Sequence, residues 1–459
     1  MTTGDASMLA GLPGLIALIV CLRRGPIYAF LNVYLPVLLL LPDDYRMPIS
    51  GQLSFSESAI LPIALFYLWN GWRDWKWSFT DGLVLAFVSM MSLAEYVNTD
   101  FALAKNLALH AIMAIIFPYM MAKALMGREE LAVQVGKRIV LFATLVAVIS
   151  VYEFRMTLNP FLTVVAPFFP AKIADVTSFR YNWVRISGPW THPILAAIIL
   201  AIAYRIVRWL DWTGYWPGNV PFLPIRKVRF CELALLVGSA MTLSRGPWIA
   251  AAVAAVIVML VRARNRALLA AMLVFAVVIV GVPGYFSFES YVSVDRGKVQ
   301  NEAQQSAAYR REMMNDYVAI AEQRPMWGWG QNNIGQGLYP IVEGMVSIDN
   351  HYLLVALNFG IYTLALLVLM LLWVPVRLFR FSLRRSRDDP ALLLGVTLAG
   401  LFVLCAISIS TVYLGAQTQP LLFLIAGWSE ALLVTPMFMT AKVPVPSRSV
   451  TYRFERVMV

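Results

Sequence analysis

Residues 309–330 read YRREMMNDYVAIAEQRPMWGWG and residues 347–360 read SIDNHYLLVALNFG. Both lie in a polar, aromatic-rich interval, whereas the sequence on either side consists mostly of long apolar runs. The interval ends with His351 at the start of a new apolar segment. A membrane protein that keeps such an interval outside the lipid usually carries out recognition or chemistry there. We therefore treat this interval as the functional centre and the apolar runs as its scaffold.

The composition predicts a membrane protein. Hydrophobic residues make up 60% of the 459 residues and charged residues 14%, and the mean hydropathy is +0.69. A soluble domain is about half apolar and about a quarter charged. Apolar runs of roughly 15–25 residues recur throughout, the length of a helix that crosses about 30 Å of hydrocarbon. Because the runs are continuous rather than alternating, we expect an all-α polytopic fold instead of a barrel.

The apolar runs give thirteen candidate spans, with the N-terminus outside. If the two short first segments do not both cross, the count becomes twelve with both ends inside. In both schemes a helical outer segment separates the tenth and eleventh runs, because residues 309–323 have helical spacing and no helix breaker precedes Pro325. The candidate spans are 8–22, 26–41, 57–70, 80–97, 103–123, 138–157, 190–204, 231–244, 247–261, 267–285, 350–374, 391–413 and 419–437.

Basic loops predict the orientation, since cytoplasmic loops collect Lys and Arg. The loops expected inside carry Arg205, Arg208, Arg226, Lys227, Arg229, Arg262, Arg264, Arg266, Arg377, Arg380, Arg384, Arg385 and Arg387, and the tail carries Lys442, Arg448, Arg453 and Arg456. The resulting division is an N-terminal transmembrane array (1–157), an outer loop (158–190), transmembrane helices carrying a Ser-Arg-Gly turn (191–285), a large outer segment (286–349), C-terminal transmembrane helices (350–437) and a cytoplasmic tail (438–459).

Several ligands are not expected. The net charge of +11 is explained by the cytoplasmic loops, so we expect no nucleic acid partner. The three cysteines, Cys21, Cys231 and Cys405, lie far apart in apolar segments and support neither a disulfide framework nor a zinc site. The outer segment shows no paired-carboxylate spacing, so we expect no catalytic metal and no cofactor.

Three arginines fall near the outer face of the predicted transmembrane helices. A charged side chain close to the membrane is costly and usually has a function. Arg185 precedes the seventh candidate span, Arg245 lies in the turn TLSRGPW, and Arg310 opens the outer helix. Three guanidinium groups on one face suit a doubly phosphorylated anion, because each offers fork-shaped donors that match phosphate oxygens. The alternative is that each arginine reaches separately toward lipid headgroups.

His351 differs from the arginines in kind. Asp349 or Asn350 can cap the helix that follows, which places His351 in its first turn. A helix N-terminus disfavours imidazolium, and a neutral ring can accept a proton from a hydroxyl group as a general base. The alternative is a hydrogen-bonded structural histidine. We expect His110, in the middle of a span, and His192, before Pro193, to be structural.

Taken together, four motifs resemble the bacterial O-antigen ligase and O-antigen polymerase superfamily. RISGPWTHPILAA resembles its first arginine motif and TLSRGPW its Ser-Arg-Gly turn. YRREMMNDYVAIAEQRPMWGWG resembles the helix that begins with arginine and ends in a Gly-rich elbow, with Arg311 as the alternative to Arg310. DNHYLLVALNFG is similar to the histidine motif. The resemblance covers roughly residues 180–375.

The resemblance implies a metal-independent glycosyltransferase of the bacterial inner membrane with a GT-C-like fold, a periplasmic active face and a cytoplasmic C-terminus. Its donor would be a glycan on undecaprenyl diphosphate. Arg185, Arg245 and Arg310 would bind the diphosphate, and His351 would activate the acceptor hydroxyl. Membrane lipids, a flippase and a chain-length regulator would be its partners.

Members of this superfamily differ in the acceptor molecule to which they transfer the glycan. We favour a polymerase that joins repeat units of exopolysaccharide, capsule or O-antigen, and the alternative is a ligase that transfers the glycan to lipid A-core. A lipid-linked glycan flippase is a third possibility. The absence of visible internal pseudo-symmetry and the gathering of polar residues at one face speak against it.

Overall fold

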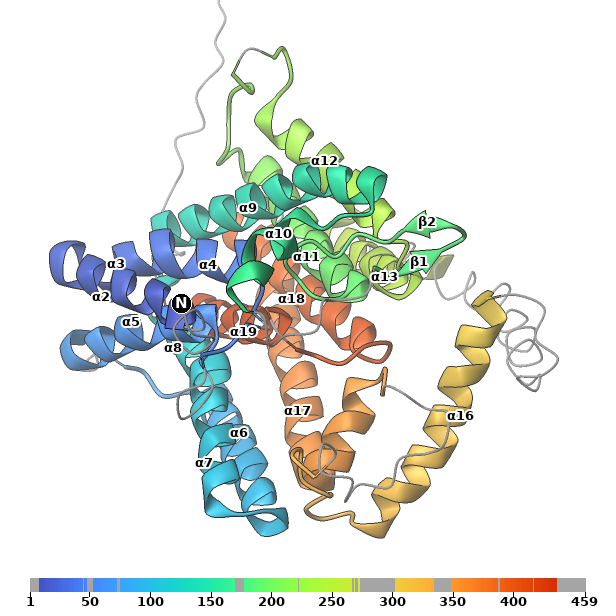
Figure 1. Cartoon of the computed structure of the whole chain (residues 1–459). Helices are drawn as coiled ribbons and strands as arrows, with labels where there is room; N and C mark the ends of the chain where they lie inside the picture. Colours follow the sequence, from blue (N-terminus) through green and yellow to red (C-terminus); the bar gives the residue numbers. More distant parts are fainter. Residues whose placement is uncertain are drawn as a thin grey trace, which may run out of the picture.

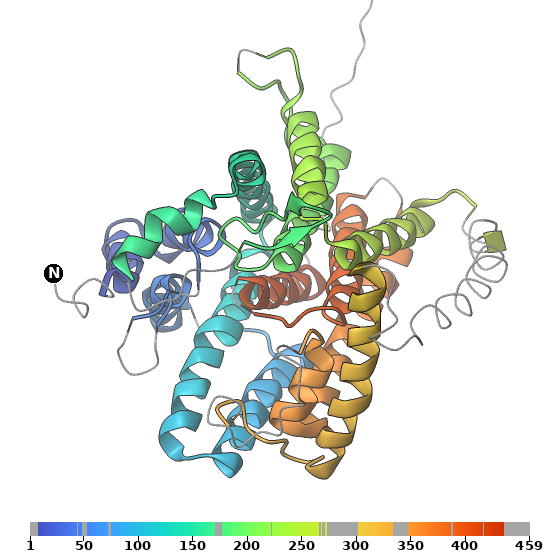
Figure 2. The same ribbon diagram turned by 45° about the vertical axis from the view of Figure 1, so that its right-hand side comes forward.

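The computed structural model describes residues 8–43, 45–47, 53–71, 75–169, 177–221, 223–265, 268, 271–272, 302–333, 348–386, 389–415 and 417–435. These residues are mostly helical, and the helices surround a central pair, α18 and α19 (Figures 1 and 2). The prediction of an all-α polytopic membrane protein is confirmed.

Twelve of the thirteen predicted spans coincide with helices, and the remaining one, 267–285, lies almost wholly outside the described residues. The twelve are α2 (Leu12–Arg24, preceded by η1, Met8–Gly11), α3–α4 (Pro26–Leu40), α5 (Phe55–Gly71), α6 (Phe79–Asn98), α7–α8 (Phe101–Leu125), α9 (Glu129–Met156), α11 (Pro193–Thr213), α12 (Lys227–Met241), α13 (Arg245–Arg262), α17 (His351–Leu383), α18 (Pro390–Ser408) and α19 (Thr418–Val434).

Among the described helices, seven are long and apolar enough to cross a membrane, and three more are apolar but shorter. Helix α2, with 13 residues, spans only about 20 Å at 1.5 Å per residue. The choice between twelve and thirteen crossings therefore remains a prediction.

Smaller elements complete the described chain. Two of the helices contain π-helical turns, η2 (Phe30–Tyr34) and η4 (Ile112–Ile116), so their α-helical parts are α3 (Pro26–Ala29), α4 (Leu35–Leu40), α7 (Phe101–Ala111) and α8 (Phe117–Leu125). Before α11 lie α10 (Pro160–Val165), η5 (Ala166–Phe168) and a two-stranded hairpin, β1 (Phe179–Arg180) and β2 (Trp183–Val184).

Helices α18 and α19 form the centre of the core, and both are buried along most of their length. A continuous apolar pattern without a polar face predicts this burial. Close approach of α19 to α8 depends on Gly427, where an added Cβ would lie 2.1 Å from the carbonyl oxygen of Tyr119. The two helices therefore pack backbone against backbone at this point.

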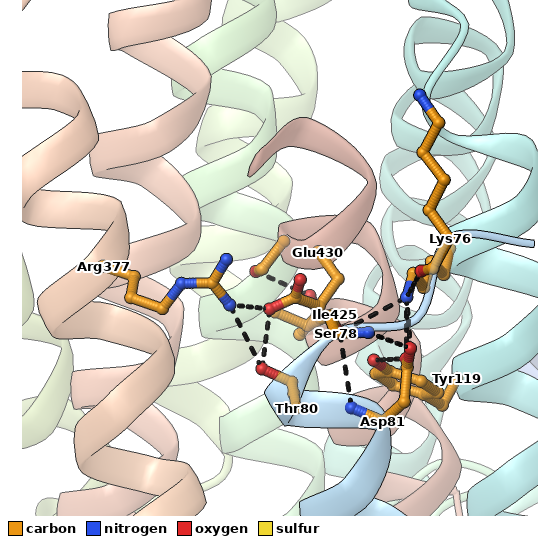
Figure 3. A network of polar contacts seen from close by, with 10 residues as sticks. Lys76, Ser78, Thr80, Asp81, Tyr119, Arg377, Ile425 and Glu430 are labelled. Atoms are coloured by element: carbon orange, nitrogen blue, oxygen red, sulfur yellow. Dashed lines mark hydrogen bonds and ion pairs between the residues drawn. The ribbon is translucent and has the colours of Figure 1, made fainter. Parts of the chain in front are cut away.

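A buried polar network joins the ends of α6, α8, α17 and α19 (Figure 3). Lys123 Nζ lies 2.6 Å from Asp81 Oδ2. Thr80 donates to Glu430 Oε1 at 2.6 Å, and Arg377 pairs with the same carboxylate. Buried charges are tolerated only when they are paired and hydrogen-bonded. The network therefore fixes these four helices relative to one another at one end of the molecule.

Helix α16 (Glu302–Gln323) confirms the helix predicted for residues 309–323, and its location on the outer side remains a prediction. Its apolar stripe, Met313, Tyr317 and Ile320, packs on Leu353 and Leu357 in the first turns of α17. The spacing of three and four residues places the stripe on one face of the helix. Helix α16 thereby lies against the segment that carries His351.

The Gly-rich elbow after α16 docks into a break in α17. Gly360 has φ 81° and ψ 178°, so the helix is interrupted there. The freed backbone groups are paired with the elbow: Trp329 N donates to Leu357 O at 2.7 Å, and Ile361 N donates to Pro325 O at 2.7 Å. An added Cβ at Gly360 would lie 2.0 Å from a backbone oxygen of the elbow. Only glycine permits this approach.

Candidate functional site

The hairpin before α11 presents the first arginine motif. Tyr181 and Asn182 have φ of 52° and 61°, the two positive values of a tight type I′ turn. Arg185 follows the hairpin, and its Nε donates to Thr242 O at 3.1 Å while its Nη2 donates to Ser244 Oγ at 2.9 Å. The first arginine motif and the Ser-Arg-Gly turn are thus bonded to each other.

Arg245 is the first residue of α13, directly after that turn. Its guanidinium lies 5.5 Å from the centre of the Tyr181 ring. The backbone N–H groups at a helix N-terminus attract anions, and this attraction adds to the attraction by the positive charge of the Arg245 side chain. Gly246 follows Arg245, and a Cβ added at this position would lie only 2.7 Å from Thr411 Oγ1, so glycine allows the close contact between the two segments. The residues after α18 therefore pack directly on this helix start.

Arg310 and Arg311 take different positions on α16. Arg310 is partly buried and lines a cavity with the other predicted arginines, whereas the side chain of Arg311 is exposed. The geometry favours Arg310 for the third motif. The cavity has a volume of about 80 Å³ and is lined by Arg180, Arg185, Ile194, Ser244, Arg245, Gly246, Arg310 and Thr411. We call it the arginine cavity.

The arginine cavity concentrates positive charge. Burial and then the charges of Arg180 and Arg310 lower the pKa of Arg185 to about 10, and Asp349 opposes this shift. Arg180 was not predicted as a site residue, and its Nη1 donates to Leu243 O at 2.7 Å. Four guanidinium groups lining one cavity favour the binding of an anion there.

His351 is the first residue of α17, as predicted, and Asn350 is the N-cap, accepting from Leu353 N at 3.2 Å. The His351 backbone N donates to Ile409 O at 2.8 Å. Its Nδ1 is buried and has no hydrogen-bond partner among the described residues. A nitrogen of the imidazole therefore remains available to a ligand.

His351 lines a second cavity, of about 270 Å³, and not the arginine cavity itself. The stretch after α18 forms part of both walls: Thr411 contributes to the arginine cavity, and Tyr413 to Gly415 contribute to that of His351. The two cavities are thus neighbours. Polar side chains of the second cavity include Arg46, His110, Gln331, Asn358 and Gln419.

The other two histidines also have defined positions. His192 is the N-cap of α11, and its Nδ1 accepts from Ile194 N at 3.2 Å, which agrees with the structural role expected of it. Burial and then the charge of Arg185 lower the pKa of His192 to about 4. His110 Nδ1 contacts the buried carboxylate of Glu57, and His110 lines the cavity of His351, a position that its mid-span location did not predict.

Two buried carboxylates hold the loops that carry the site. Glu153 accepts from Ser187 N at 2.8 Å and Gly188 N at 3.0 Å, just after Arg185. Glu95 accepts from Gln331 N at 2.6 Å and Asn332 N at 3.2 Å, just after the elbow. Sequence reasoning missed both residues, although a lone acid within an apolar span is itself a signal of function or of loop anchoring.

These observations define a class: a helical, multi-pass membrane protein with a strongly basic cavity beside a histidine at a helix start. Within the described residues, no group of three His, Cys, Asp or Glu side chains could hold a metal ion.

Residues 231–368 match the family model for O-antigen ligase. This match confirms the resemblance to the O-antigen ligase and polymerase superfamily, and it includes Arg245, Arg310 and His351. The match and the apolar helices support a multi-pass membrane protein with a function of the O-antigen ligase or polymerase type. No curated protein matches the chain.

Proposed function

We propose that the protein is a metal-independent glycosyltransferase of the bacterial inner membrane that polymerises polysaccharide repeat units. The donor is a glycan on undecaprenyl diphosphate, bound at the periplasmic face, and the C-terminus is cytoplasmic. The acceptor is the terminal sugar of a second lipid-linked glycan.

The convergence of Arg185, Arg245 and Arg310 supports this proposal most strongly. The three residues come from the hairpin loop, the start of α13 and the outer helix, yet they line one cavity together with Arg180. No aspartate or glutamate is among the described residues that line it. Separate anchoring to lipid headgroups does not require such convergence. A diphosphate, with several oxygens for fork-shaped donors, fits it.

The adjoining cavity supports a role for His351 as the base. In the proposed reaction, the acceptor oxygen attacks the anomeric carbon of the donor sugar, and its proton passes to the imidazole. The bond between that carbon and the diphosphate oxygen breaks, and the lipid diphosphate leaves with the electron pair. The arginines stabilise the charge that develops on this leaving group, so the reaction needs no nucleotide.

The test uses the purified protein with a lipid-diphosphate-linked repeat unit. We expect His351→Ala to lose activity by about 10²–10⁴-fold while donor binding persists. The matched control is Tyr352→Phe, which keeps the next aromatic ring of α17 and removes the hydroxyl that donates to Ala406 O. Full activity of His351→Ala in protein of normal yield would exclude His351 as the base.

One observation favours the ligase alternative: the matched family model describes an O-antigen ligase. A deletion strain separates the two functions. A polymerase deletion leaves single-repeat products, whereas a ligase deletion leaves long chains on the lipid carrier. If the wild-type chain restores the normal glycan products of the deletion strain and His351→Ala does not, the phenotype is linked to the proposed site.

A further inference from the structure

A second basic pocket lies between α2, α5, α8 and α19. Its volume is about 500 Å³, the largest of the cavities described above. Four basic side chains line it: Arg24, Lys76, Lys123 and Arg128. No aspartate or glutamate is among the described residues of its lining. We call it the basic pocket.

Most of the charge in the basic pocket is not balanced by the protein. Lys123 is paired with Asp81, at 2.6 Å. Arg24 donates to the hydroxyl of Tyr28, which is neutral. Within the described residues, Lys76 and Arg128 form no ion pair. In Figure 3 the ammonium group of Lys76 extends away from the polar network. Three positive charges thus remain for a ligand.

The surroundings of the basic pocket suit an amphiphile. Leu15, Ile19 and Leu22 of α2 are 55%, 43% and 67% exposed, and their spacing forms an apolar stripe that leads to Arg24. Trp69, near the end of α5, and Trp77, just before α6, are 89% and 63% exposed. Exposed tryptophans mark the headgroup level of a bilayer.

We propose that the basic pocket binds the phosphate headgroup of an anionic glycerophospholipid, whose acyl chains lie along the exposed stripe of α2. Basic pockets between transmembrane helices recognise such headgroups by charge. Trp75 adds an aromatic wall, with Lys123 Nζ 4.6 Å from the centre of its ring.

This lipid site is separate from the arginine cavity. Lys123 and Asp81 belong to the network that reaches Arg377, in the C-terminal half of α17. His351 is the first residue of the same helix. The inference therefore does not depend on the proposed glycosyltransferase activity, and its test needs no substrate.

The test is native mass spectrometry of the purified full chain, titrated with phosphatidylglycerol or phosphatidylcholine. We expect the wild type to retain one phosphatidylglycerol selectively. Arg24→Gln with Arg128→Gln should weaken this binding at least about tenfold, since each basic side chain near the headgroups contributes about fivefold. The control, Arg23→Gln with Arg155→Gln, removes the same charge from exposed positions outside the pocket and should change binding less than about twofold.

Should the first double variant fail to fold, Lys76→Gln replaces one exposed side chain and should weaken binding about fivefold. Equal retention of the two lipids, or equal losses in the test and control variants, would overturn the proposal. Displacement of the lipid by millimolar inorganic phosphate would overturn it as well, because the pocket would then select a soluble anion.

Discussion

Arg310 and Arg311 are neighbours of the same type with different surroundings. Arg310 lines the arginine cavity, and Arg311 is exposed on α16. We expect Arg310→Gln to lower the transfer rate by about a hundredfold, the effect of losing one preorganised donor to a developing charge. Arg311→Gln should stay within about twofold. Rates measured on the purified protein test this difference, and equal losses would contradict the assignment of Arg310.

His192 links stability to pH. Its pKa is lowered from 6.5 to about 4 in the folded protein, so the unfolded chain binds the proton more tightly. The free energy of unfolding should therefore fall as the pH drops from about 6.5 to about 4. His192→Asn keeps an N-cap residue and removes the titration, and thermal unfolding midpoints in detergent should then depend less on pH. An unchanged pH dependence would exclude His192 as its source.

Individual site residues were predictable to different degrees. Arg185, Arg245 and His351 stand out because each is polar at the edge of an apolar run, and Arg310 stands out because it opens a polar helix between two apolar runs. Arg180 does not, because only the turn of the hairpin brings it beside Arg185, and two-residue strands leave no periodic pattern.

At the scale of elements, the break in α17 places the strictest requirement on a single residue, because Gly360 has a positive φ and no room for a side chain. Gly360→Ala would place a Cβ 2.0 Å from Met326 O at a φ of 81°, and we expect it to destabilise the protein by about 3 kcal/mol or more. Gly82→Ala is the matched control, since nothing lies within 4 Å of its added Cβ. Chemical or thermal unfolding of both variants measures the difference. Comparable stability would mean that the elbow is not docked as described.

Helix positions were largely predictable, and the details of their packing were not. The positions of twelve helices followed from apolar length alone, because a helix in lipid must satisfy its own backbone hydrogen bonds. The break at Gly360 escaped the same reasoning, since the sequence HYLLVALNFGIYTLALL is mostly apolar on both sides. The elbow from Pro325 to Gly330 supplies the partners for the broken helix, and such a tertiary contact has no local signature.

For the whole molecule, orientation is the main open prediction. Cysteine labelling of intact cells tests it at two exposed positions, Arg311→Cys on α16 and Arg226→Cys before α12. We expect a membrane-impermeant reagent to modify the first from outside and the second only after permeabilisation. The native cysteines, all buried, should not contribute. The reverse pattern would invert the topology.

The anchoring of Arg185 has a consequence for ligand affinity. Its guanidinium is held by Thr242 O and Ser244 Oγ without any ligand. Immobilising a long side chain costs about 0.5–1.5 kcal/mol on binding, and here that rotamer entropy is already lost when the chain folds. The serine of the Ser-Arg-Gly turn can thus raise the affinity for an incoming anion by holding Arg185 in place beforehand.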